Sequence, residues 1–72
     1  MLMKRFGEKL RTLRKRQGLS LRELAPMLGV QYGYVGKMER GERHPNTTMV
    51  LKVADIFGVS TDQLMRDEVE LG

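Results

Sequence analysis

The amino-acid sequence predicts an all-α fold, a compact bundle of five short helices. Two observations predict it. Stretches in which apolar residues recur every three or four positions begin just after residues that cap helix N-termini, namely Ser20, Asn46 and Ser60. Glycines suited to the left-handed conformation past a helix end punctuate the same chain: Gly18, Gly29, Gly41 and Gly58. With 72 residues, the chain has room for one domain and one small core.

The first helix is expected over residues 3–16. Phe6, Leu10 and Leu13 lie at positions i, i+4 and i+7 and form a narrow apolar stripe among basic residues. A helix that lies on a membrane surface has a similar basic amphipathic pattern. The thin stripe favours a core helix instead, because the rest of the chain needs a third surface to close its core.

The second helix is expected from residue 20 or 21 to 28, and the third over about 31–39. Ser20 and Glu23 form a capping box at the start of the second helix. Pro26 inside it predicts a local bend and not a lost helix. The third helix has low helix propensity because it holds two glycines, so it depends on packing by its apolar residues against the second helix.

The fourth helix is expected over 47–57, capped by Asn46, and the fifth over 61–66, opened by a second capping box of Ser60 and Gln63. The inward stripe of the fourth helix holds Val50, Val53, Ala54 and Phe57. The sequence thus predicts one domain over residues 1–66, followed by an acidic, frayed tail over 67–72.

Composition narrows the class of protein. Apolar residues make up 40% and charged residues 31% of the chain, which is typical of a globular protein. There is no cysteine and a single histidine, so no thiolate metal site and no combination of nucleophile, base and orienting group is expected. We therefore expect no enzyme, no cofactor and no metal. The apolar runs are too short for a membrane span, and a cytoplasmic location is expected.

The basic residues are concentrated in the first third of the chain. Residues 1–22 hold eight basic residues and one acidic residue, a net charge of +7. Residues 23–45 are balanced, and residues 46–72 hold two basic and five acidic residues, a net charge of −3. Such polarity can orient a protein in the field of a polyanion. Charge alone would also allow RNA, but the four aromatic residues form no stacking platform.

Four segments in order resemble the phage repressor and Cro-type helix-turn-helix family, also called the Xre family. They are KLRTLRKRQGLS, LRELAPMLGV, MERGERHPN and VADIFGVSTDQL. The resemblance implies a lambda-repressor-like fold with the helix-turn-helix at the second and third helices. It also implies a cytoplasmic transcriptional regulator, a homodimer that binds an inverted repeat in double-stranded DNA.

The resemblance makes the helix over 31–39 the recognition helix, which enters the major groove. Its exposed, base-reading residues would be Gln31, Tyr32, Gly33, Gly36 and Lys37. Glutamine can pair with adenine, and lysine can donate to guanine or to phosphate. Contacts to DNA phosphate would come from Arg40, Arg43, His44, Lys9, Arg5 and Tyr34, with Lys4 beside them. Surface packing is the alternative for the two tyrosines.

Three features of the sequence qualify this implied site. Arg14 and Glu39 match a structural pair that joins the first helix to the end of the third in related repressors. Leu21 stands where family members often carry a glutamine that grips phosphate. Glycine has no side chain that can contact a base, so two glycines at base-reading positions imply few direct base contacts. More of the specificity would then come from DNA shape.

Two further alternatives stay open. The first is a protein-interaction module, antitoxin-like or adaptor, that retains the fold with weak or non-specific DNA binding. The second is a monomer in place of a dimer whose symmetric patch would include Met49, Ile56, Met65, Val69 and Leu71. The operator, the sign of regulation, the controlled genes and any effector are not encoded in a form the sequence reveals.

Overall fold

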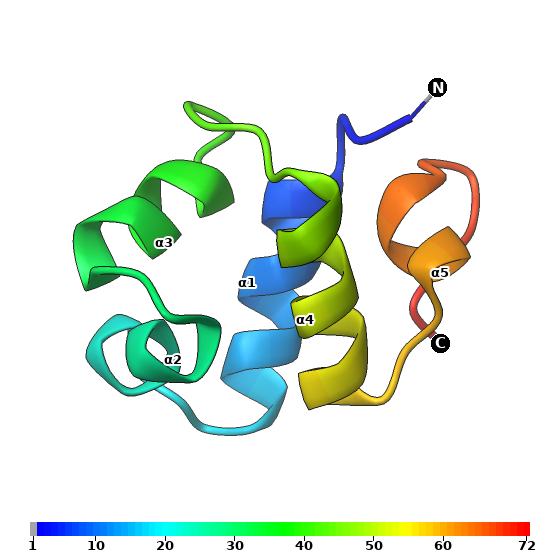
Figure 1. Cartoon of the computed structure of the whole chain (residues 1–72). Coiled ribbons are helices and arrows are strands. Elements are labelled where there is room, and N and C mark those ends of the chain that lie inside the picture. The colour runs from blue at the N-terminus through cyan, green and yellow to red at the C-terminus, as the bar shows by residue number, and fades with distance from the viewer. Residues whose placement is uncertain (1) are drawn as a thin grey trace.

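The computed structural model describes residues 2–72 and contains five helices (Figure 1). The all-α prediction is confirmed. Within residues 2–72, the only strand-like pairing is an isolated bridge between Leu2 and Arg66. The helices are α1 (Phe6–Arg16), α2 (Leu21–Leu28), α3 (Tyr32–Glu39), α4 (Thr47–Phe57) and α5 (Thr61–Met65).

Helix α1 begins at Phe6 and not at residue 3. Met3 has a positive φ of 70°, and its N–H donates to the carbonyl of Met65 at 2.7 Å. Arg5, the residue just before α1, is held by a residue far along the chain, because its backbone N–H donates to Oδ1 of Asp67 at 2.9 Å. The residues before α1 therefore run beside the end of α5, and a helix there would break this contact.

The predicted local start and stop signals are present. Ser20 with Glu23 and Ser60 with Gln63 form complete capping boxes, and the Asn46 side chain accepts from Met49. Helix α2 continues through Pro26. The buried apolar residues are Phe6, Leu10, Leu13, Leu24, Ala25, Leu28, Val35, Met38, Met49, Val50, Val53, Ala54 and Leu64. They come from all five helices and form one core.

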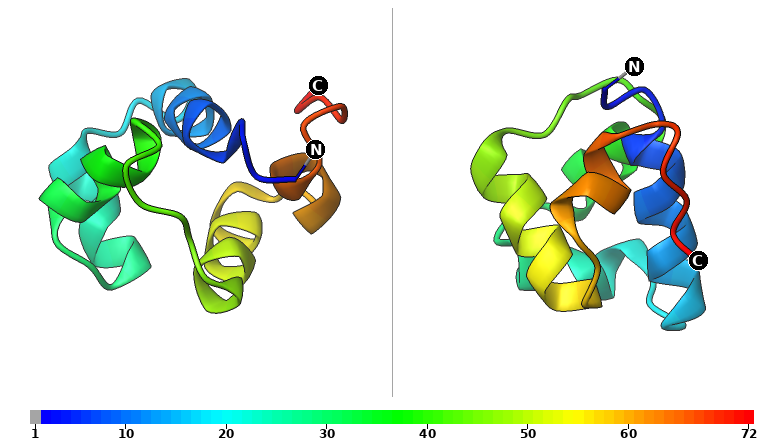
Figure 2. Two further views of the ribbon diagram at one scale, coloured as in Figure 1. Left: turned by 90° about the horizontal axis from the view of Figure 1, so that it is seen from above. Right: turned by 90° about the vertical axis from the view of Figure 1, so that its right-hand side faces the viewer.

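Helix α1 lies between the two halves of the bundle (Figures 1 and 2). It packs against α3 on one side and α5 on the other, while α2 contacts α3 and α4. The crossing of α1 and α3 is very close at Gly7. A Cβ built on Gly7 would overlap the Met38 carbonyl oxygen and lie 2.6 Å from that of Glu39. Only glycine allows this approach of two backbones.

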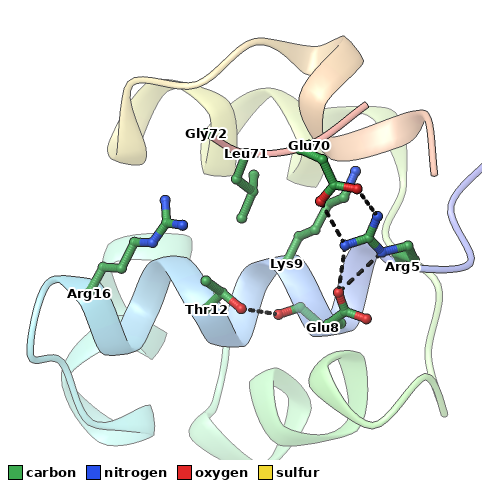
Figure 3. A pocket seen from close by; sticks show the side chains of 8 residues that line it. All are labelled: Arg5, Glu8, Lys9, Thr12, Arg16, Glu70, Leu71 and Gly72. Atoms are coloured by element: carbon green, nitrogen blue, oxygen red, sulfur yellow. Dashed lines mark hydrogen bonds and ion pairs between the residues drawn. The ribbon is translucent and has the colours of Figure 1, made fainter. Parts of the chain in front are cut away.

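Hydrogen bonds hold the tail over 67–72 against the start of the chain, whereas its acidic composition predicts a frayed end. The Lys9 ammonium donates to the carbonyl oxygens of Gln63, Arg66 and Val69 at 2.6, 2.8 and 2.6 Å. Lys9 is buried, with 1% of its surface exposed. Arg5 donates to the Glu70 carboxylate at 2.9 Å (Figure 3). It also donates to the Asp67 carbonyl at 2.8 Å. We call this set, formed by Arg5, Lys9, Asp67, Val69 and Glu70, the α1 clamp.

Candidate nucleic-acid interface

Helices α2 and α3 form a compact pair whose turn is set by glycine. Gly29 has a φ of 73°, a left-handed conformation that ends α2. Val35 and Met38 of α3 are buried with Leu24 and Ala25 of α2. The rear of α3 is thus held by the core, and the opposite side of the helix is left facing solvent.

An ion pair fixes the C-terminal end of α3 to α1. Nε and Nη2 of Arg14 donate to the Glu39 carboxylate at 2.7 and 3.0 Å, and Nη1 donates to the Leu19 carbonyl at 2.9 Å. The two side chains are only 12% and 6% exposed. Glu39 raises the pKa of Arg14 by accepting these bonds. Arg14 is therefore occupied within the protein although it belongs to the basic segment.

The outward side of α3 carries exposed polar groups. Gln31 precedes the helix as its N-cap residue, Tyr32 is 46% exposed, and Gly33 and Lys37 are exposed. The Lys37 and Arg43 side chains make no hydrogen bond or ion pair within the described chain. A groove of about 480 Å³ runs along this side, lined by Val30, Gln31, Gly33, Tyr34, Lys37 and Arg43. We call Gln31, Tyr32, Gly33, Lys37 and Arg43 the α3 face.

Gly36 does not belong to the exposed side of α3, contrary to its predicted base-reading role. It is buried against α2, and a Cβ there would lie 3.7 Å from Cδ1 of Leu21 and 3.1 Å from Nη1 of Arg40. A Cβ on Gly33 would meet nothing within 4 Å. The two glycines of α3 therefore differ: Gly36 allows close packing, and Gly33 leaves open space on the face.

The structure contradicts the predicted phosphate contact of Lys9, and it places Arg5 against two carboxylates. Lys9 is buried and its three donors are used by carbonyls, so it cannot reach DNA. Arg5 donates hydrogen bonds to the Glu8 and Glu70 carboxylates, and these bonds raise the pKa of Arg5. Lys4, in contrast, is exposed.

The remaining predicted phosphate residues lie near the end of α3. Arg43 and His44 are exposed and line a small cavity together with Lys4. Arg40 is exposed but bonded to Glu42, which raises the pKa of Arg40. Tyr34 is half-buried and packs against the core. Leu21 likewise packs against the core at the start of α2.

Sequence reasoning missed one pair at the edge of this face. The guanidinium carbon of Arg22 lies 4.1 Å from the centroid of the Tyr32 ring. Nη2 of Arg22 also donates to the Tyr32 hydroxyl oxygen at 3.2 Å. Ten residues separate the two in sequence, and only the angle between α2 and α3 brings them together. No local pattern signals this contact.

The chain matches the helix-turn-helix family model over residues 10–64, most of its length. It belongs to the helix-turn-helix family. The HTH-type transcriptional regulator YazB of Bacillus subtilis is 32% identical over 63 residues, which cover 88% of this chain and 91% of YazB. The prophage-derived regulator YonR of the same bacterium is 38% identical over 61 residues, covering 85% of this chain and 56% of YonR. The chain thus spans nearly all of one relative and about half of the other.

Solved structures agree with this assignment. The P22 c2 repressor in complex with a synthetic operator superposes with a TM-score of 0.80 at 28% identity, covering 88% of this chain and 96% of the repressor chain. The N-terminal DNA binding domain of SinR from Bacillus subtilis gives 0.74 at 33% identity, covering 83% and 88%. The predicted resemblance to phage repressors is confirmed. The helix-turn-helix family is one of transcription regulators and not a class of enzymes.

Two kinds of feature are absent from residues 2–72. No helix there is long and apolar enough to cross a membrane. No group of three or more His, Cys, Asp or Glu side chains in that range is placed to hold a metal ion.

Proposed function

We propose that this protein is a sequence-specific regulator that binds double-stranded DNA with α3 in the major groove. One observation carries the proposal. The α3 face presents donors of Gln31, Lys37 and Arg43 to solvent, while the rear of α3 is fixed by the core and by the Arg14–Glu39 pair. A rigid helix with an exposed polar side is what base readout in the major groove requires. The similarity to the P22 c2 repressor, whose structure contains an operator, supports it.

The proposed roles follow from chemistry and position. Gln31 pairs with adenine through its amide, and Lys37 donates to guanine or to phosphate. Arg43 and His44 contact phosphate, which sets the position of the protein but not its sequence preference. Tyr34 and Arg40 contribute less, because Tyr34 is half-buried and Arg40 is engaged by Glu42. A protein that binds chromosomal DNA acts in the cytoplasm of a bacterium, so we also propose a cytoplasmic location.

We propose further that two copies bind an inverted repeat and act as a repressor. The residues predicted to form the apolar patch of the dimer are not exposed. Met49 is buried, and Ile56, Met65, Val69 and Leu71 are half-buried. Leu51 on α4 is 51% exposed instead. It lines an apolar groove of about 380 Å³ with Met3, Pro45, Val50, Thr61 and Met65. Such a patch suits a self-complementary contact.

Selection from a random DNA library, at several salt concentrations, tests DNA binding. We expect an enriched inverted repeat with half-sites about one helical turn apart. Arg43→Ala should weaken all sequences alike and reduce the salt slope by about one, whereas Lys37→Ala should change the preference at one base position. The matched control is Arg66→Ala, an exposed cation at the end of α5. Failure to enrich any motif would leave the protein-interaction module as the better hypothesis.

Sedimentation tests the dimer. We expect a dimer at micromolar concentration that dissociates in Leu51→Glu. Met27→Glu is the control, because Met27 is 49% exposed on α2, away from this groove. A wild-type protein that sediments only as a single 8.3 kDa species would contradict the free dimer.

A further inference from the structure

The Arg22–Tyr32 pair joins the starts of the two helices that form the helix-turn-helix. Arg22 is the second residue of α2, and Tyr32 is the first residue of α3. The guanidinium lies over one side of the ring, 4.1 Å from its centroid, and both side chains are exposed at the edge of the α3 face. A cation stacked on an aromatic ring is attracted by the ring's electron-rich surface.

The hydrogen bond within the pair fixes what the Tyr32 hydroxyl can do. The hydroxyl oxygen accepts from Nη2 of Arg22 at 3.2 Å. A tyrosine hydroxyl has one O–H donor besides its acceptor sites, so the O–H remains free to donate. A hydroxyl that accepts from a cation is also polarised toward donation. The Tyr32 hydroxyl is therefore set up to donate to an acceptor atom of a ligand, and it disfavours a ligand atom that is itself a donor.

Among the residues described, the groove beside the pair holds no second cation. The shallow groove beside the pair is lined by Ala25, Pro26, Val30 and Gln31 in addition to Arg22 and Tyr32. Ala25, Pro26 and Val30 have apolar side chains. Arg22 is thus the side chain that both covers the ring and donates to its hydroxyl.

We infer that Arg22 is a positioning residue for base readout, which holds the Tyr32 hydroxyl as a hydrogen-bond donor toward the DNA. This inference rests on the proposed DNA-binding function. In the major groove, guanine, adenine and thymine each present an acceptor, while cytosine presents only its amino donor. Tyr32 therefore discriminates against cytosine at the base that it faces.

A simple phosphate contact by Arg22 makes a different prediction. It would add affinity for every sequence and contribute to the salt slope, independently of Tyr32. A positioning role changes the preference at one base and depends on the Tyr32 hydroxyl. The two roles are separable with conservative variants, because Arg22→Met keeps much of the apolar stem and Tyr32→Phe keeps the ring.

The test is library selection with the wild-type chain, Arg22→Met, Tyr32→Phe and the double variant, with Arg66→Met as control. We expect cytosine discrimination at one position to fall about five- to tenfold in each single variant, as for the loss of one good base contact. The double variant should lose nothing more. Arg22→Lys should restore little, because an ammonium does not provide the planar fork that stacks and donates together.

Two results overturn the inference. In the first, Arg22→Met keeps the wild-type base preference and only binds all sequences more weakly. In the second, the losses in the two single variants add. Each result leaves the proposed function intact. If the wild-type chain enriches no motif, the proposed function fails and the inference fails with it. Circular dichroism of each variant, expected unchanged because both side chains are exposed, separates misfolding from altered readout.

Discussion

The α1 clamp and the α3 face each hold two cations, but they use these cations in opposite ways. Arg5 and Lys9 of the clamp are bound by carboxylates and carbonyls of the same chain. Lys37 and Arg43 of the α3 face are exposed to solvent. A positive charge that is satisfied internally adds to stability, and one that is left exposed can bind a polyanion. The density of basic residues in a sequence therefore does not locate the binding surface.

The same contrast holds for packing. On the α1 side, two backbones meet at Gly7 and the Lys9 side chain is buried, so substitutions at these two positions disturb packed contacts. On the α3 face, Gly33 leaves open space and side chains extend into solvent. Changes on the α1 side should thus alter stability, and changes on the α3 face should alter binding.

Gly7→Ala should have the largest effect. The added methyl group would overlap the carbonyl oxygen of Met38, which is backbone and cannot move aside. Forcing α1 and α3 apart should lower the free energy of unfolding by about 3 kcal/mol. Urea denaturation measures it, with Gly33→Ala as the matched control. An unchanged midpoint for Gly7→Ala would show that the two helices are not held at this distance.

Lys9→Met should come next, with a loss of about 3 kcal/mol or slightly less. Methionine fills a similar volume but leaves the carbonyls of Gln63, Arg66 and Val69 without their shared donor. The salt slope of DNA binding should stay the same, because Lys9 is 1% exposed and cannot touch phosphate. If Lys9→Met reduced the salt slope of DNA binding and left the stability unchanged, Lys9 would be a DNA contact after all.

Local rules explain what the sequence predicted well. The capping boxes at Ser20 and Ser60 and the Asn46 cap depend on residues three apart, so their helices were placed within a residue. The predicted start of α1 is wrong because the contact that holds Arg5, the residue before the helix, is to Asp67, 62 residues away. The acidic tail was expected to fray because composition does not reveal that Arg5 and Lys9 hold it.

The site was harder to predict than the fold for a related reason. Three glycines look alike in sequence, but Gly7 sits at a helix crossing, Gly36 is buried against α2, and Gly33 faces open space. Only the arrangement of α1, α2 and α3 separates them. The Arg22–Tyr32 pair depends on that arrangement too.

Gly33→Ala should have a smaller effect of the opposite sign. Gly33 lies in α3 without a positive φ, and an added Cβ would meet no atom within 4 Å. Replacing glycine by alanine within a helix should raise the free energy of unfolding by about 1 kcal/mol. Because the methyl group lies on the α3 face, we also expect an altered base preference in library selection. Greater stability with an unchanged motif would place Gly33 outside the DNA contact.

The smallest effect should be a local response of the α1 clamp to acid. Arg5 lowers the pKa of Glu70 by donating to its carboxylate at 2.9 and 3.1 Å. Since this pKa is lower in the folded than in the unfolded chain, the pair stabilises above the ordinary value of 4.5 and its contribution is lost as the pH falls through the folded pKa. Hydrogen exchange of the Val69 amide, corrected for intrinsic rates, should therefore accelerate at low pH.

Glu70→Gln is the control for that response, because the amide cannot titrate and its tail should exchange at a corrected rate independent of pH in this range. The Glu70 side chain is 71% exposed, so solvent screens the pair and the global unfolding transition should move little. An equal acid response in Glu70→Gln would assign the opening to another carboxylate of the tail. DNA binding at neutral pH should be unaffected by Glu70→Gln, because the α1 clamp does not include the exposed cations Lys37 and Arg43.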